Sequence, residues 1–128
     1  MEYGFSKTVG YSYDQAVEKV TEELKKEGFG VLTSIDVKDT MKKKLDVDFK
    51  KYVILGACNP GLAHKALTAE IDLGLLLPCN VIVYENDQNK TVIGFFDPKL
   101  MAKLIDNPEL NGIADEVFHK LQRVYAEL

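Results

Sequence analysis

The chain has 128 residues, of which 46% are hydrophobic and 28% are charged, and its net charge is −4. This length suits one hydrophobic core, so we expect a single domain over residues 1–128. The composition is close to the globular average and excludes disordered and collagen-like chains. The negative net charge argues against nucleic acid as a partner, because such proteins carry an excess of basic residues.

Two segments bear on secretion and on membranes. Residues 1–15 lack the basic start and apolar run of a secretory signal peptide. The longest apolar stretch, from Leu73 to Val83, contains Pro78 and Asn80 and is far shorter than the roughly 20 residues of a membrane-spanning helix. We therefore predict a cytoplasmic protein that does not bind membranes.

The chain opens with patterns typical of a strand, a helix and a second strand. Residues 3–9 mix aromatic and β-branched residues, which favours a strand. Ser12 and Gln15 have the spacing of a capping box, and the helix that they begin has Gly28 placed to end it. Residues 29–35 are rich in aromatic and β-branched residues and predict the second strand.

A short surface helix is predicted over residues 37–45, with Asp36 as its cap. Val37, Met41 and Leu45 recur every four residues and form one narrow apolar stripe. Lysines and aspartates are interleaved around this segment, a pattern typical of a solvated face. They are Lys42, Lys43, Lys44, Lys50 and Lys51 with Asp39, Asp46 and Asp48.

The middle of the chain predicts a central strand and another helix. Residues 52–58 are continuously apolar, as expected of a strand covered on both faces. Asn59 and Pro60 form a helix-start pair, because asparagine caps free N–H groups and proline loses no hydrogen bond at the first helical position. The helix is predicted over residues 61–73, with Gly74 placed to end it.

The last part of the chain predicts a hairpin followed by two helices. Residues 75–84 and 90–96 read as paired strands around the turn-forming residues 86–89. Asp97-Pro98 and Asn107-Pro108 repeat the pattern of a cap followed by proline. They predict helices over residues 99–105 and 109–128.

The order of these elements lacks the strict strand and helix alternation of a doubly wound parallel sheet. We therefore predict an α+β fold, a single compact domain in which a mixed sheet of about five strands is packed by helices.

Three short motifs resemble one known family. They are Cys58-Asn59-Pro60 at a helix start, the run Leu75-Leu-Leu-Pro-Cys-Asn-Val81 at a strand entry, and Asp97-Pro98 after the hairpin. In their order and spacing they are similar to the domain-of-unknown-function family 302, over nearly the whole chain. The resemblance implies a compact α+β domain that pairs as a homodimer, and it implies no activity or substrate.

Cys58 and Cys79 are the first candidates for chemistry. A cysteine just before a helix N-terminus meets free N–H groups that favour a thiolate or an anion. The alternative is that Cys58 is a small buried residue ending a core strand. A strand–helix–strand crossover is usually parallel, which would place the two cysteines at opposite ends of their strands. They lie close together only if the strands are offset, or if residues 75–78 carry Cys79 well along the sheet before pairing begins.

The predicted ligand-binding residues are Cys58, Asn59, Cys79 and Asn80. The two asparagines can donate and accept hydrogen bonds beside apolar segments, although they could equally be a helix cap and a strand-edge contact. We predict no metal site, because zinc-ligand spacing is absent; Cys58, His64 and Cys79 would be its candidates.

Two functions remain open from the sequence. The preferred hypothesis is a non-catalytic homodimeric module that binds a small molecule or a partner near the two cysteine segments. The alternative is a thiol- or metal-dependent activity that uses Cys58, Cys79 and His64. The sequence identifies no cofactor.

Overall fold

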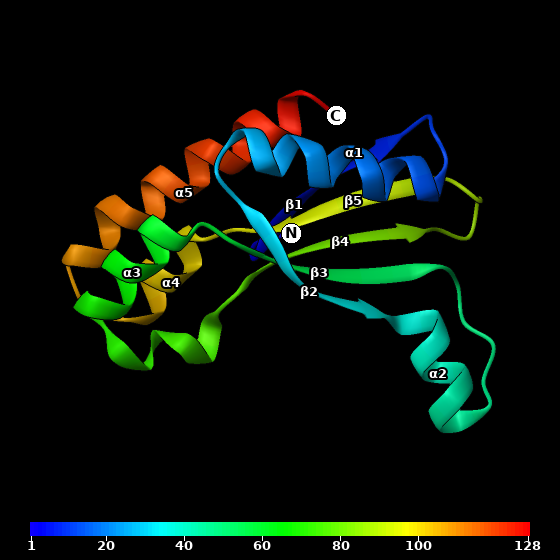
Figure 1. Cartoon of the computed structure of the whole chain (residues 1–128), viewed down its shortest axis with the longest axis horizontal. Helices are drawn as coiled ribbons and strands as arrows, with labels where there is room; N and C mark the ends of the chain where they lie inside the picture. The colour runs from blue at the N-terminus through cyan, green and yellow to red at the C-terminus, as the bar shows by residue number, and fades with distance from the viewer.

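Five strands form one sheet in the order β1-β5-β4-β3-β2, and every neighbouring pair is antiparallel (Figure 1). The structure is a computed structural model and describes all 128 residues. The predicted α+β fold with about five strands is confirmed. The strands are β1 (Gly4–Val9), β2 (Gly30–Asp36), β3 (Tyr52–Cys58), β4 (Cys79–Glu85) and β5 (Thr91–Phe96).

Helices cover one face of the sheet and gather at one of its ends. In Figure 1, α1 and α5 run over the same face, α3 and α4 lie with η1 at one end, and α2 projects from the other. None of the helices is long and apolar enough to cross a membrane. The helices are α1 (Tyr13–Lys26), α2 (Val37–Leu45), α3 (Pro60–Ala69), α4 (Lys99–Leu104), α5 (Glu109–Ala126) and the 3₁₀ helix η1 (Ile71–Leu76).

The core lies between the sheet and the helices. Along β3 and β4, the side chains that point to α1 and α5 are buried, as expected when successive strand residues face opposite sides. The helices contribute the apolar stripes that their sequences predicted. The core includes Val53, Leu55, Ala57, Val81, Val83, Ile93 and Phe95 from the strands, and Ala16, Val20, Leu24, Leu121 and Val124 from α1 and α5.

The opposite face of the sheet, called the outer face below, carries mostly half-buried or exposed side chains, with Val92 of β5 buried among them. Ile35, Ile54 and Ile82 lie in one row across β2, β3 and β4. Beside them, the rings of Tyr52 and Tyr84 stack at 5.2 Å between centroids. The part of this face around the isoleucine row and the tyrosine pair is therefore apolar without belonging to the core cluster.

The predicted caps of α1 and α2 are present, whereas the N-cap positions of α4 and α5 are held by Pro98 and Pro108, which supply no side-chain cap. Ser12 and Gln15 form a reciprocal capping box at the start of α1. Gly28 follows α1 with a φ of 85°, a conformation that glycine adopts without steric cost. Asp36 accepts a hydrogen bond from the Asp39 N–H at 3.0 Å, and α2 has no buried residue, as predicted for a surface helix.

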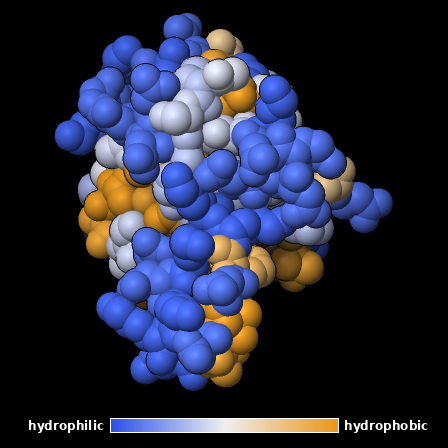
Figure 2. Space-filling view, turned by 90° about the vertical axis from the view of Figure 1, so that its right-hand side faces the viewer, coloured by the Kyte–Doolittle hydropathy of each residue, from blue (hydrophilic) through white to orange (hydrophobic).

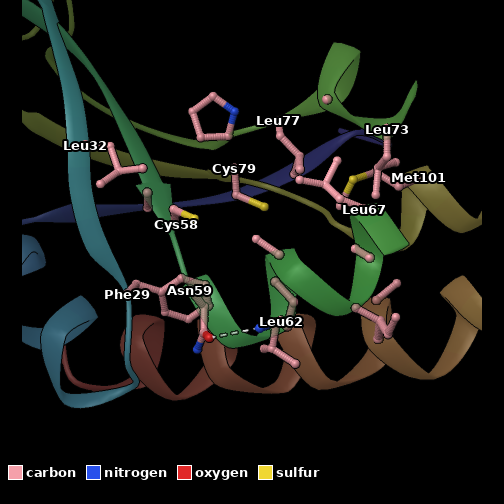
Figure 3. Close-up of a pocket in the computed structure, with 18 of the residues that line it drawn as sticks. Phe29, Leu32, Cys58, Asn59, Leu62, Leu67, Leu73, Leu77, Cys79 and Met101 are labelled. Carbon is pink, nitrogen blue, oxygen red and sulfur yellow. Dashed lines mark hydrogen bonds between the residues drawn. The ribbon is translucent and has the colours of Figure 1, made fainter. Parts of the chain in front are cut away.

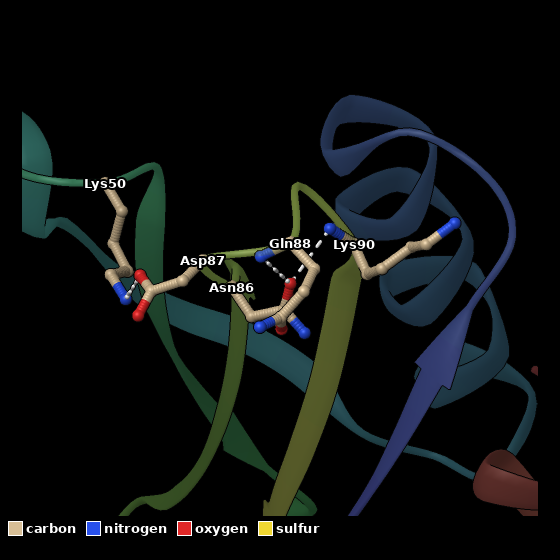
Figure 4. Close-up of polar contacts among 5 residues, drawn as sticks. All are labelled: Lys50, Asn86, Asp87, Gln88 and Lys90. Carbon is tan, nitrogen blue, oxygen red and sulfur yellow. Dashed lines mark hydrogen bonds and ion pairs between the residues drawn. The ribbon is translucent and has the colours of Figure 1, made fainter.

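The predicted hairpin turn between β4 and β5 is held by the Asn86 side chain (Figure 4). Its Oδ1 accepts hydrogen bonds from the backbone N–H groups of Gln88 and Lys90, both at 3.0 Å. Lys50, which lies just before β3, forms an ion pair with Asp87 at 3.0 Å.

Three expectations were wrong in detail. The sheet is wholly antiparallel rather than mixed, because the chain between β3 and β4 turns back at one end of the sheet instead of crossing its face. Helix α3 ends at Ala69 rather than Leu73, and Gly74 lies within η1 rather than ending α3. Residues 75–78 are not strand, because η1 continues to Leu76 and β4 begins only at Cys79.

Candidate functional site

A cavity of about 340 Å³ lies at the end of the sheet where β3 ends and β4 begins (Figure 3). The ends of these strands form one side, α3 and η1 form the next, and α4 and α5 close it. Sixteen of its 20 lining residues are hydrophobic. They include Leu62, Ala63, Ala66 and Leu67 of α3, Leu73 of η1, Met101 of α4, and Leu110, Ile113, Ala114 and Val117 of α5.

None of the 20 lining residues carries a charge. Besides Cys58 and Cys79, the only lining side chains with polar atoms are those of Thr33 and Asn59. A phosphate, a carboxylate or an ammonium group placed here would lose its hydration without gaining a charged partner, which is costly. The cavity is therefore suited to an uncharged, apolar molecule.

The antiparallel pairing of β3 and β4 brings the two cysteines together. Ala57 is the register partner of Cys79, and Cys58 is the next residue. Both cysteines line the cavity, and Figure 3 shows both sulfur atoms directed into it. The parallel crossover that would have separated them does not occur. The two cysteines are therefore close together, through antiparallel pairing rather than through an offset or a displaced entry of parallel strands.

The two thiols differ in their surroundings. Cys79 is buried and Cys58 is half-exposed. Burial, with a smaller contribution from the neighbouring Cys58, raises the pKa of Cys79 to about 11. The Cys79 thiol is therefore protonated at neutral pH, which keeps this part of the cavity uncharged.

This difference predicts selective alkylation. We expect iodoacetamide at pH 8 to modify Cys58 in the folded protein and to leave Cys79 unmodified until denaturant is added, because the thiolate is the nucleophile and Cys79 is both buried and protonated. Peptide mass mapping measures this. Equal labelling of both cysteines in folded protein would contradict the assignment.

Asn59 positions the start of α3 beside the cavity. Its Oδ1 accepts a hydrogen bond from the Leu62 N–H at 3.3 Å, which is the predicted cap. Its Nδ2 donates to the Glu27 carbonyl at 3.4 Å, next to the end of α1. One end of the amide caps α3 and the other ties the start of α3 to the end of α1, so Asn59 acts first as a positioning residue.

Two sequence candidates lie outside the cavity. Asn80 pairs with Gly56 across β3 and β4, is exposed, and does not line the cavity. His64 is exposed on α3 and does not line it either. No group of three or more histidine, cysteine, aspartate or glutamate side chains is placed to hold a metal ion.

Most of the cavity wall could not be predicted from the sequence. Met101 and the α5 residues Ile113, Ala114 and Val117 line the cavity, although the sequence indicated only that α5 has an apolar face. Their periodicity predicts burial, but it does not say which element they face.

The comparisons with known proteins agree with this architecture. The family model described as "Domain of unknown function DUF302" matches residues 5–128. The chain belongs to the DUF302 family. A solved structure described as "uncharacterized conserved protein DUF302 from Bacillus stearothermophilus" is 30% identical, with a TM-score of 0.89. The match covers 97% of this chain and 96% of that one. No curated protein matches the sequence.

Proposed function

We propose that this DUF302 domain binds a small, uncharged, apolar molecule in the cavity and does so without catalysing a reaction. The observation that carries the proposal is a cavity of about 340 Å³ with no charged lining residue. Ligand pockets in proteins are of roughly 300–1,000 Å³ and are lined mainly by hydrophobic side chains with a few polar groups. Thr33, Asn59 and the two thiols supply those polar groups here.

The lining residues also argue against the alternative of a thiol- or metal-dependent activity. Such an activity needs a cysteine as thiolate, and the pKa of about 11 disfavours that form at Cys79, which leaves Cys58 alone as a nucleophile. His64 lies outside the cavity and cannot serve as a base there. Two free thiols are compatible with the cytoplasmic location that we propose, since thiols stay reduced in that compartment.

The test uses an uncharged fluorescent probe, N-phenyl-1-naphthylamine, titrated with wild-type protein. Ala63 lines the cavity from α3 and is half-exposed, so Ala63→Phe adds a ring at the cavity wall. We expect this variant to bind the probe at least about tenfold more weakly, a difference of about 1.4 kcal/mol. Fluorescence titration measures it.

The matched control is Ala102→Phe. Ala102 is a half-exposed alanine on α4 that does not line the cavity. This variant should bind the probe as the wild type does. Failure of wild-type protein to bind the probe, or equal loss in both variants, would count against the cavity as the binding site.

We also propose that the chain pairs with a second copy of itself through the outer face. The isoleucine row and the stacked Tyr52 and Tyr84 give this face an apolar surface of the kind that symmetric pairing covers. Sedimentation equilibrium should give the mass of a dimer. A sharp monomer mass at tens of micromolar protein would refute the pairing.

A further inference from the structure

A projecting segment at one end of the sheet leaves part of its apolar side exposed. This segment, called the arm, comprises residues 37–51, that is, α2 and the residues that lead to β3. Leu45 is 66% exposed and Val47 is 46% exposed. In Figure 2, which views this end of the molecule, the projecting lower part is hydrophilic with a hydrophobic flank along one side. An amphipathic helix normally buries such a stripe.

A second exposed apolar segment lies at the other end of the sheet, beside the cavity. This segment, called the rim, comprises residues 70–76, that is, Glu70 and η1. Leu73 points into the cavity and is 1% exposed. Ile71 and Leu75 are 77% and 89% exposed. The rim therefore closes the cavity with one side and offers an apolar surface with the other.

Arm and rim are complementary in charge. The arm holds six lysines and three aspartates, a net charge of +3, so the rest of the chain carries −7. The rim contains Glu70 and Asp72 and no basic residue. Lys44 of the arm and Asp72 of the rim form no ion pair within their own chain.

The arm cannot reach the rim of its own chain. The two segments lie at opposite ends of the sheet (Figure 1). Strand β3, which joins these ends, has seven residues and spans about 20 Å at roughly 3.3 Å per residue. A two-fold axis that lies over the outer face and runs across the strands exchanges the two ends, so each arm of such a pair meets the other copy's rim.

We propose that the arm of one copy docks on the rim of a second copy and closes the partner's cavity. The rim of each copy is thus occupied by the basic, partly apolar arm of the other copy. In this arrangement, Leu45 and Val47 pack against Ile71 and Leu75. Lys44 forms an ion pair with the carboxylate of Asp72. The closing of a ligand cavity rests on the function proposed above, whereas the docking itself does not.

The first test replaces an exposed leucine on each side. Leu45→Asp and Leu75→Asp should each raise the dimer dissociation constant at least about tenfold in sedimentation equilibrium, because each puts a charge into an apolar contact. Each should also speed the release of N-phenyl-1-naphthylamine in stopped flow. Leu104→Asp is the matched control, since Leu104 is 63% exposed on α4 and belongs to neither segment. It should leave both measurements unchanged.

The second test exchanges charges. Lys44→Asp and Asp72→Lys should each weaken the dimer, and the double variant should recover most of the loss, since both copies then carry the reversed pair. A monomeric wild type, or arm and rim variants that pair as the control does, would overturn the docking. If those variants split the dimer while wild type binds no probe, the docking holds and the ligand-binding function fails.

Discussion

Replacing Gly56 with alanine is expected to lower the free energy of unfolding by about 2 kcal/mol, within the 1–3 kcal/mol typical of overpacking. Gly56 lies in β3, where a Cβ would be 2.7 Å from Cγ of Pro78 and would also overlap the Thr33 hydroxyl. The proline ring cannot rotate away, and Thr33 is β-branched with restricted rotamers. Strands β2 and β4 must therefore shift relative to β3. Urea denaturation measures the loss.

The control for this variant is Gly30→Ala. Gly30 lies in β2 opposite Cys58, and a Cβ there meets no atom within 4 Å. Its effect should stay within about 0.5 kcal/mol, as for substitutions that create no clash. Equal stability of the two variants would show that Thr33 and Pro78 move aside without cost, and would contradict the close packing around Gly56.

Structural features that depend on interactions between residues close in the chain were predictable from the sequence. The caps at Ser12, Asp36 and Asn59 each depend on a side chain and an N–H group only three residues away. Helix α2 and strand β3 have the bounds that their patterns predicted, 37–45 and 52–58. Such short-range interactions are present in the sequence itself, because no distant contact is needed to form them.

The direction of β4 could not be predicted, since it depends on where residues 59–78 pack. The usual rule for a strand–helix–strand unit places the helix across the sheet. Here α3 contacts α5 and η1 at the end of the sheet, and the chain re-enters next to the point where it left. This choice is made by tertiary packing of α3 on α5, residues that are about 50 positions apart.

The candidate site was predictable only where it depends on local signals in the sequence. Cys58, Asn59 and Cys79 were identified because they flank predicted strand and helix ends, and all three line the cavity. Asn80 was grouped with Cys79 although consecutive strand residues point to opposite faces. Met101 reaches the cavity only through the packing of α4 on α5, which no local pattern encodes.

Replacing Leu73 with alanine is expected to lower the free energy of unfolding by about 2–5 kcal/mol, the range for buried leucines. Leu73 is the one buried residue of η1, so it anchors this segment over the cavity. The exposed Leu104 is the control, and Leu104→Ala should change stability by less than about 0.5 kcal/mol.

The same variant separates two roles of Leu73. If its side chain only fills space, Leu73→Ala enlarges the cavity and N-phenyl-1-naphthylamine still binds, because an apolar void accepts apolar molecules. If Leu73 holds η1 in place, the segment detaches and probe binding falls together with stability. We expect the second result, since no other η1 side chain is buried and the helix has no side-chain cap at its start. Unchanged probe affinity in a destabilised protein would show that η1 is held by its backbone connections alone.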